Sequence, residues 1–291
     1  RADEIRQALG ADILMFNVES MGELERISAV ASDMGKTARI SLRINPDVDP
    51  KTHPYISTGL KKNKFGLDIE QSLAAYSRAV TLPGIEPVGI DCHIGSQLTT
   101  LEPFLEALDR IIRFYDRLKA MGIRIEYLDL GGGLGITYNE EEPPHPTEFG
   151  KALVSVLKDH PMTLILEPGR VIAGNSGILL TEVVYTKKTP SKSFVIVDAA
   201  MNDLVRPSLY GSFHAIREVE PKGRPDVNVD VVGPICESGD FLARDRDLPG
   251  VEQGELLAVF SAGAYGFTMS SNYNSRPRAA EVIVDGDKAT L

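Results

Sequence analysis

Short apolar segments alternate regularly with longer segments of helical periodicity over the first 170 residues, and this feature constrains the fold most. Residues 13–18 form an apolar, strand-sized segment, and apolar residues then recur at helical spacing through 21–35. The alternation continues, with strands expected at 40–44, 88–94, 125–130 and 163–166 and helices at 69–81, 101–121 and 149–158. Strands that alternate with helices form parallel sheets with right-handed crossovers. We therefore predict an α/β structure for this part of the chain.

The pattern changes after about residue 177. Glycine and proline now separate strand-like segments, and only 210–216 shows a weak helical pattern. The strands are expected at 178–187, 193–197, 227–232, 256–261 and 280–284. We therefore predict two domains, an α/β domain over 1–177 and a mostly antiparallel β domain over 178–291.

Composition excludes several classes of protein. The net charge of −10 argues against a nucleic-acid partner and against binding to an anionic membrane surface. No apolar run approaches the roughly 20 residues that a membrane span requires. The chain has two cysteines, Cys92 and Cys236, and no CxxC pair. These features predict a cytoplasmic protein without a disulfide framework, and no metal site is predicted.

Small polar or glycine-rich clusters follow three of the expected strands. They occupy 91–96, 129–135 and 166–170. In an α/β barrel the carboxyl ends of the strands face the active site. We therefore expect these three clusters to converge on one pocket.

Each cluster allows a functional and a purely structural interpretation. Gly131, Gly132 and Gly133 form either a phosphate cradle of backbone N–H groups or a tight strand-to-helix turn. His93 is either a flat ring packed against a planar cofactor or a core histidine. Ser96 either donates a hydrogen bond to a phosphate or caps a helix or a loop.

The remaining candidates are equally open at this level. Glu167 either faces a protonated pyridine nitrogen or forms an ion pair with Arg170. Most cysteines are inert small hydrophobes, but Cys236 lies among acids, serine and glycines. The polar segment 272–278 is either part of a site or a solvated loop.

Taken in order, these segments resemble the diaminopimelate decarboxylase family, in the alanine-racemase-like fold type of pyridoxal-phosphate enzymes. Each motif is weak singly, and their order along nearly the whole chain carries the resemblance. The motifs are 16–20, 45–48, 52–59, 93–97, 131–135, 167–170, 198–202, 236–240 and 261–266.

The resemblance implies an eight-stranded (β/α) barrel of the TIM type that binds pyridoxal 5′-phosphate, followed by a β-rich domain. His93 would act in catalysis and stack on the pyridoxal ring, and Glu167 would pair with the pyridine nitrogen. The other expected cofactor-binding residues are Ser96, Gly131, Gly132, Gly133, Gly169, Arg170 and Tyr265.

The resemblance also implies a substrate with an amino-acid head at each end, diaminopimelate, and lysine as its product. Arg170, Arg206 and Tyr210 would grip the distal carboxylate of the substrate, while Glu237 would meet the distal ammonium. Tyr265 is also expected to bind the substrate. Cys236 would protonate the carbanion after carbon dioxide leaves. In this family Cys236 and Glu237 reach the site of the second subunit of a homodimer.

One departure from the family pattern is serious. The lysine that forms a Schiff base with the cofactor lies in a Lys-Ala-Asn-like motif, which this sequence lacks. Lys61, Lys62 and Lys64 lie in a loop-like stretch of different character. Five of the eight strands of a barrel are expected here. We therefore expect a chain truncated at both ends and inactive when expressed alone.

Three alternatives to this function stay open. The first is a non-catalytic homologue that binds the cofactor or a protein partner. The second is a related ornithine or arginine decarboxylase, whose substrates have no distal carboxylate. The third is a barrel that binds another phosphorylated ligand, against which the placement of His93 and Glu167 counts.

Overall fold

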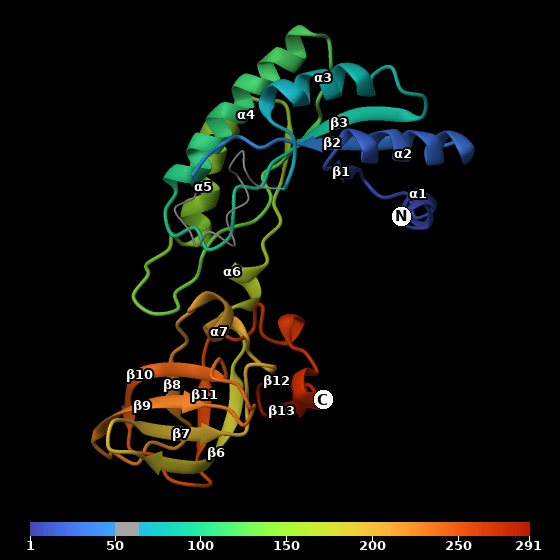
Figure 1. Ribbon diagram of the computed structural model, residues 1–291. Coiled ribbons are helices and arrows are strands. Elements are labelled where there is room, and N and C mark those ends of the chain that lie inside the picture. The colour runs from blue at the N-terminus through green and yellow to red at the C-terminus, as the bar shows by residue number, and fades with distance from the viewer. Residues whose placement is uncertain (50–63) are drawn as a thin grey trace. The chain divides into compact units, whose positions relative to one another are not determined.

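The computed structural model describes residues 1–49 and 64–291 (Figure 1). The chain divides into two compact units, one made of 1–135 and 143–168 and the other of 136–142 and 169–291. The predicted boundary after residue 177 lies within the second unit. The 52–59 motif, Lys61 and Lys62 lie outside the described residues.

The first unit is built on a parallel sheet in the order β1-β2-β3-β4-β5, which confirms the predicted α/β fold. Its strands are β1 (Phe16–Val18), β2 (Ala38–Arg43), β3 (Ile85–Asp91), β4 (Tyr127–Asp129) and β5 (Thr163–Ile165). The helices of the unit are α1 (Ala2–Gly10), α2 (Met21–Asp33), α3 (Ile69–Ala79), α4 (Glu102–Ala120) and α5 (Pro146–Leu157).

Helix α2 shows why the sequence pattern predicts these elements well. The Ser20 side chain accepts a hydrogen bond from the Glu23 N–H at 3.3 Å and so caps the helix N-terminus. Leu24, Ile27 and Ala31 recur at helical spacing and are almost fully buried. The cap and the apolar stripe together fix both the start of the helix and the face that it buries.

The expected strand at 13–18 is too long. Only Phe16–Val18 pairs with β2, and Ile13 and Leu14 are 42% and 46% exposed. Asp12 has a positive φ of 51°, which places a turn immediately before these two residues. Apolar character alone therefore overestimates the length of this strand.

The second unit carries a mixed sheet in the order β10-β9-β7-β6-β11-β8, in which only β7 and β9 pair in parallel. This arrangement confirms the predicted, mostly antiparallel β domain. The strands are β6 (Leu179–Lys188), β7 (Ser193–Val197), β8 (Ile216–Glu218), β9 (Asp226–Val232), β10 (Phe241–Pro249) and β11 (Leu256–Val259).

Shorter elements complete the second unit. They are α6 (Arg170–Ala173), α7 (Arg206–Tyr210), the 3₁₀ turns η1 (Phe267–Met269) and η2 (Tyr273–Ser275), and the hairpin β12 (Ile283–Asp285) and β13 (Lys288–Thr290). Its core is lined by apolar side chains from several strands, including Val183, Val197, Val231 and Val259.

The main differences from the sequence prediction in the second unit concern α7 and β10. The helical segment expected at 210–216 is wrong, because Gly211, with a φ of 62°, ends α7 at Tyr210. Strand β10 is not predicted, because charged residues fill its centre and its pairing with β9 is interrupted by register shifts.

Among the helices described, none combines the length and apolar character needed to cross a membrane.

Candidate active site

The loops that follow β3, β4 and β5 lie side by side in the first unit. The backbone ladder continues beyond the strands, because the Cys92 N–H donates to the Asp129 carbonyl at 2.9 Å and the Glu167 N–H donates to the Gly131 carbonyl at 2.9 Å. The structure thereby brings His93, the glycine turn and Glu167 to one edge of the parallel sheet.

The glycine turn is held so closely that no side chain fits on it. A Cβ on Gly132 would lie 2.3 Å from the Glu167 carbonyl oxygen, and one on Gly133 would lie 2.4 Å from the Gly95 carbonyl oxygen. Gly131 and Gly133 also have positive φ values of 64° and 114°. These positions therefore require glycine, because neighbouring backbone occupies the space of a side chain.

His93 lies beside this turn as a neutral ring. The Gly132 N–H donates to His93 Nδ1 at 3.3 Å, so this nitrogen is an acceptor. Burial lowers the pKa of His93 to about 4, and the positive charge of Arg43 contributes in the same direction. The ring is therefore uncharged at neutral pH.

Ser96 lies in the loop after β3 and is half-buried. The alternative role of helix N-cap is wrong for this residue, because α4 begins at Glu102 and its N-cap is Leu101. Phosphate binding by Ser96 stays a prediction, and the alternative role of loop cap stays open.

Acidic side chains gather under these loops. The Asp129 carboxylate accepts hydrogen bonds from the Gly131 N–H at 2.9 Å and from Asn17 Nδ2 at 3.1 Å. The Glu167 side chain is exposed, and desolvation and the neighbouring Asp129 carboxylate raise its pKa. Arg43 Nη1 donates to Glu19 Oε1 at 2.6 Å. These carboxylates favour the binding of a positively charged group next to Glu167.

The raised pKa of Asp91 predicts how the free energy of unfolding depends on pH. Burial and then the Asp129 charge raise the pKa of Asp91 to about 8. The folded state therefore keeps a proton that the unfolded state releases near pH 4. The stability from this proton is complete below pH 4 and is lost as the pH rises toward 8, with a slope of up to about 1.4 kcal/mol per pH unit.

We expect Asp91→Asn to flatten this slope between pH 6.5 and 8, and the comparison isolates Asp91 because both proteins contain the same histidines. Urea unfolding of the wild type and the variant across this range measures the effect. Parallel pH profiles for the two proteins would contradict the assigned pKa.

The second unit contains a buried pair of arginines that share one tyrosine. Arg170 Nη1 donates to the Tyr138 hydroxyl at 2.5 Å, and the Arg206 guanidinium lies 4.5 Å from the centre of the Tyr138 ring. The Tyr265 ring centre lies 4.7 Å from the Arg170 guanidinium carbon. Arg170 and Arg206 are both buried. We call Arg170, Arg206 and Tyr138 the arginine cluster.

The arginine cluster is suited to an anionic ligand. Burial and the charge of Arg170 lower the pKa of Arg206. Within 1–49 and 64–291, Arg206 forms no ion pair with an acidic side chain. Two buried guanidinium groups repel one another, so a carboxylate bound between them is stabilised. Tyr210, at the end of α7, is half-buried near Arg206.

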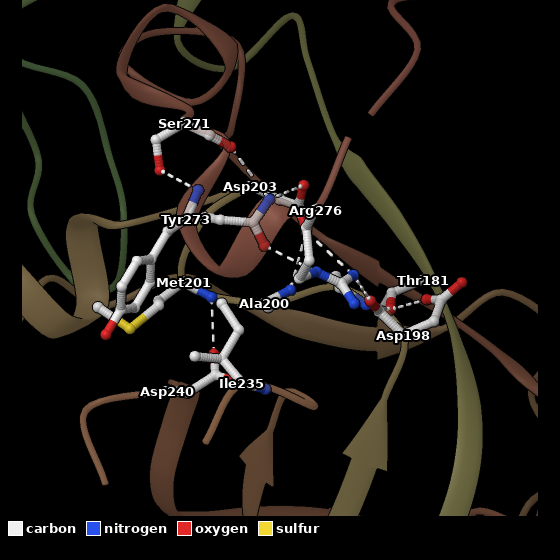
Figure 2. A network of polar contacts seen from close by, with 12 residues as sticks. Thr181, Asp198, Ala200, Met201, Asp203, Ile235, Asp240, Ser271, Tyr273 and Arg276 are labelled. Carbon is white, nitrogen blue, oxygen red and sulfur yellow. Dashed lines mark hydrogen bonds and ion pairs between the residues drawn. The ribbon is translucent and has the colours of Figure 1, made fainter. Parts of the chain in front are cut away.

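The loop that carries Cys236 and Glu237 is fixed by a polar network (Figure 2). The buried Asp240 carboxylate accepts hydrogen bonds from the Met201 N–H at 2.7 Å and from the Ile235 N–H at 2.6 Å. The Tyr273 hydroxyl donates to Glu237 Oε2 at 2.6 Å. The Cys236 thiol is exposed at the surface of this chain.

The same network extends to neighbouring segments. Arg276 Nε donates to Asn202 Oδ1 at 3.0 Å, and a second nitrogen of Arg276 donates to the Asp198 carbonyl. The Ser208 hydroxyl donates to the Gly239 carbonyl, which joins the loop to α7. The polar segment 272–278 is therefore structured and supports the loop.

Sequence patterns missed several residues that contact the predicted site residues. Tyr138, Asp129 and Asp240 act through hydrogen bonds to groups far away in the sequence. No local spacing marks such partners, although Asp129 and Asp240 lie within motifs already noted. The described ranges contain no group of three or more His, Cys, Asp or Glu side chains placed to hold a metal ion.

The residues of the first unit fit pyridoxal phosphate. The glycine turn presents backbone without side chains, and a neutral planar ring, His93, adjoins it. Glu167 is exposed and lies beside the Asp129 carboxylate, which favours a protonated ring nitrogen. These are the three features that a phosphate group, a flat ring and a pyridine nitrogen require.

Comparison with known proteins agrees with this fit. Residues 1–174 match the family model described as pyridoxal-dependent decarboxylase, pyridoxal binding domain. A diaminopimelate decarboxylase of Pseudomonas aeruginosa is 56% identical over 286 residues, which are 98% of this chain and 69% of that protein. One of Vibrio cholerae is 55% identical over 289 residues, 99% of this chain and 69% of that protein.

A solved structure agrees as well. The crystal structure of diaminopimelate decarboxylase from Helicobacter pylori complexed with L-lysine has a TM-score of 0.95 and 46% identity, and the match covers all of this chain and 72% of that one. These findings confirm the predicted family, the carboxy-lyase class and the pyridoxal cofactor. The chain belongs to the pyridoxal-dependent decarboxylases and, among them, to the diaminopimelate decarboxylase family.

Proposed function

We propose that this chain takes part in the decarboxylation of meso-2,6-diaminopimelate to L-lysine, the last step of lysine biosynthesis. The arginine cluster is the observation that carries the proposal, because two buried guanidinium groups around Tyr138 suit a substrate with a second carboxylate. Ornithine and arginine offer no such group. The similarity to diaminopimelate decarboxylases supports the same substrate.

The first unit would bind the cofactor. Gly131, Gly132 and Gly133 would hold the phosphate together with Ser96, and His93 would pack on the ring. Glu167 would keep the ring nitrogen protonated, and the Asp129 charge beside it acts in the same direction. When bound, pyridoxal phosphate would stabilise the electron pair that stays on the substrate carbon when carbon dioxide leaves. Gly169, Arg170 and Tyr265 complete the proposed cofactor-binding residues.

The second unit would bind the distal end of the substrate. Arg170, Arg206 and Tyr210 would hold the distal carboxylate, with Tyr265 adjoining Arg170. Glu237 would meet the distal ammonium. The Cys236 thiol would deliver the proton that replaces carbon dioxide, and the exposed position of this thiol supports access to a reacting atom.

We propose further that the active protein is a cytoplasmic homodimer with an eight-stranded barrel, without a nucleic-acid or membrane partner. Five parallel strands support the barrel, and the exposed Cys236 and Glu237 support a site completed by the loop of a second subunit. Two free cysteines and a net charge of −10 support the compartment and the absence of a nucleic-acid partner.

The proposal is tested with the enzyme that contains this chain, supplied with pyridoxal phosphate. We expect carbon dioxide and lysine in equal amounts from diaminopimelate, and far slower release from ornithine, arginine or lysine. Equal rates with ornithine or arginine would favour the related decarboxylases. Cofactor binding without carbon dioxide release from any of these substrates would favour a non-catalytic homologue.

A further inference from the structure

His214 is a buried histidine that contacts the arginine cluster. It lies in the segment between α7 and β8, and none of its surface is exposed. Its Nε2 lies 2.8 Å from Arg206 Nη1, and its Nδ1 lies 2.8 Å from the Phe260 carbonyl oxygen. Its ring meets the Tyr138 ring edge-on, with centroids 5.3 Å apart.

These two contacts fix the tautomer of His214. A carbonyl oxygen only accepts hydrogen bonds, so Nδ1 carries the proton and donates it to Phe260. A guanidinium only donates, so Nε2 presents its lone pair to Arg206. The ring can satisfy both neighbours only in the neutral form.

The surroundings of His214 keep the ring neutral. The charges that act on it most strongly are those of Arg206, Arg170 and Arg246, and Arg246 Nη1 donates to the His214 backbone carbonyl at 2.8 Å. Burial and these three charges lower the pKa of His214 to about 4, although the hydrogen bond to Phe260 opposes the shift.

A neutral acceptor has a specific advantage at this position. A carboxylate in place of His214 would hold the Arg206 guanidinium equally well but would cancel its charge. The imidazole instead fixes one guanidinium nitrogen, and the Tyr138 ring covers the guanidinium face. Arg206 is thereby oriented while its full positive charge stays available for an anion.

We propose that His214 is a positioning residue that orients Arg206 toward the distal carboxylate of the substrate. This inference rests on the proposed function, in which Arg206 binds that carboxylate. His214 itself is not expected to touch the substrate or the cofactor.

The test compares two amide substitutions in the enzyme that contains this chain. The amide of His214→Gln reaches the position of Nε2 and can accept from Arg206, whereas the shorter amide of His214→Asn reaches only the position of Nδ1. We expect His214→Asn to raise KM for diaminopimelate about 10- to 100-fold, since it removes a hydrogen bond to a charged group. His214→Gln should change KM by less than about threefold, and kcat should change less than KM in both.

A third variant, His214→Glu, places a carboxylate against Arg206. It should raise KM for diaminopimelate at least as much as His214→Asn, because it neutralises the guanidinium. An unchanged KM in His214→Glu, or equal KM values in the Asn and Gln variants, would overturn the assignment of His214.

Arg206→Ala separates this failure from failure of the proposed function. Suppose that Arg206→Ala selectively lowers kcat/KM for diaminopimelate and the His214 variants do not. His214 is then not a positioning residue, but the proposed function stands. If Arg206→Ala has no selective effect on diaminopimelate, the proposed distal site itself is wrong.

Discussion

Cys236→Ala is expected to lower kcat for diaminopimelate by about 10²- to 10⁴-fold, with a much smaller change in KM. The thiol's proposed task is proton delivery after carbon dioxide has left, a step that contributes nothing to binding of the ground state. Cys236 is exposed, and the Asp240 carboxylate accepts from the adjacent Ile235 N–H at 2.6 Å and from the Met201 N–H at 2.7 Å. The substitution should therefore remove the proton donor without moving the loop.

Steady-state kinetics of the wild type and Cys236→Ala measure this effect. Thermal unfolding and the absorbance of the bound cofactor serve as controls, and both should be unchanged. An unchanged kcat would return Cys236 to the role of an inert surface thiol.

Arg206→Ala is expected to lower kcat/KM for diaminopimelate by an amount equivalent to about 2–5 kcal/mol, the usual cost of removing one partner of a buried charge pair. Arg206 is buried, and the distal carboxylate would lose this partner. A surface ion pair would contribute only about 0–1 kcal/mol.

Arg217→Ala is a matched control for this prediction. Arg217 lies in β8 of the same unit, and its side chain is exposed and packs over Phe260. We expect this variant to change kcat/KM by less than about twofold, because surface substitutions away from such sites have small effects. A loss as large as that of Arg206→Ala would indicate a general effect of removing positive charge.

Local patterns predicted the parallel sheet and most of its helices. In α2, for example, the Ser20 cap and the buried stripe through Leu24 and Ile27 are both readable from spacing alone. The prediction of strands failed where apolar character in the sequence does not match burial in the structure. Strand β10 was not predicted because its centre is charged. Ile13 and Leu14 were predicted to belong to a strand because they are apolar, but both are exposed and lie outside it.

The residues of the candidate site also fall into those that the sequence predicted and those that it did not. His93, Glu167 and the glycine turn lie in motifs whose order along the chain carried the family resemblance. The residues that orient the site, such as Tyr138 and His214, were not predicted, because their importance comes from contacts across distant segments. The contact between His214 and Phe260, for example, joins positions 46 residues apart.

The ratio of kcat/KM for diaminopimelate to kcat/KM for lysine tests the central claim most directly. It is measured in the wild type and in Arg206→Ala. Lysine lacks the distal carboxylate, so the wild-type ratio should be large and should collapse in the variant, with little further loss of the slow reaction with lysine. If both substrates lose activity by the same factor, the ratio is unchanged, and the arginine cluster does not select diaminopimelate.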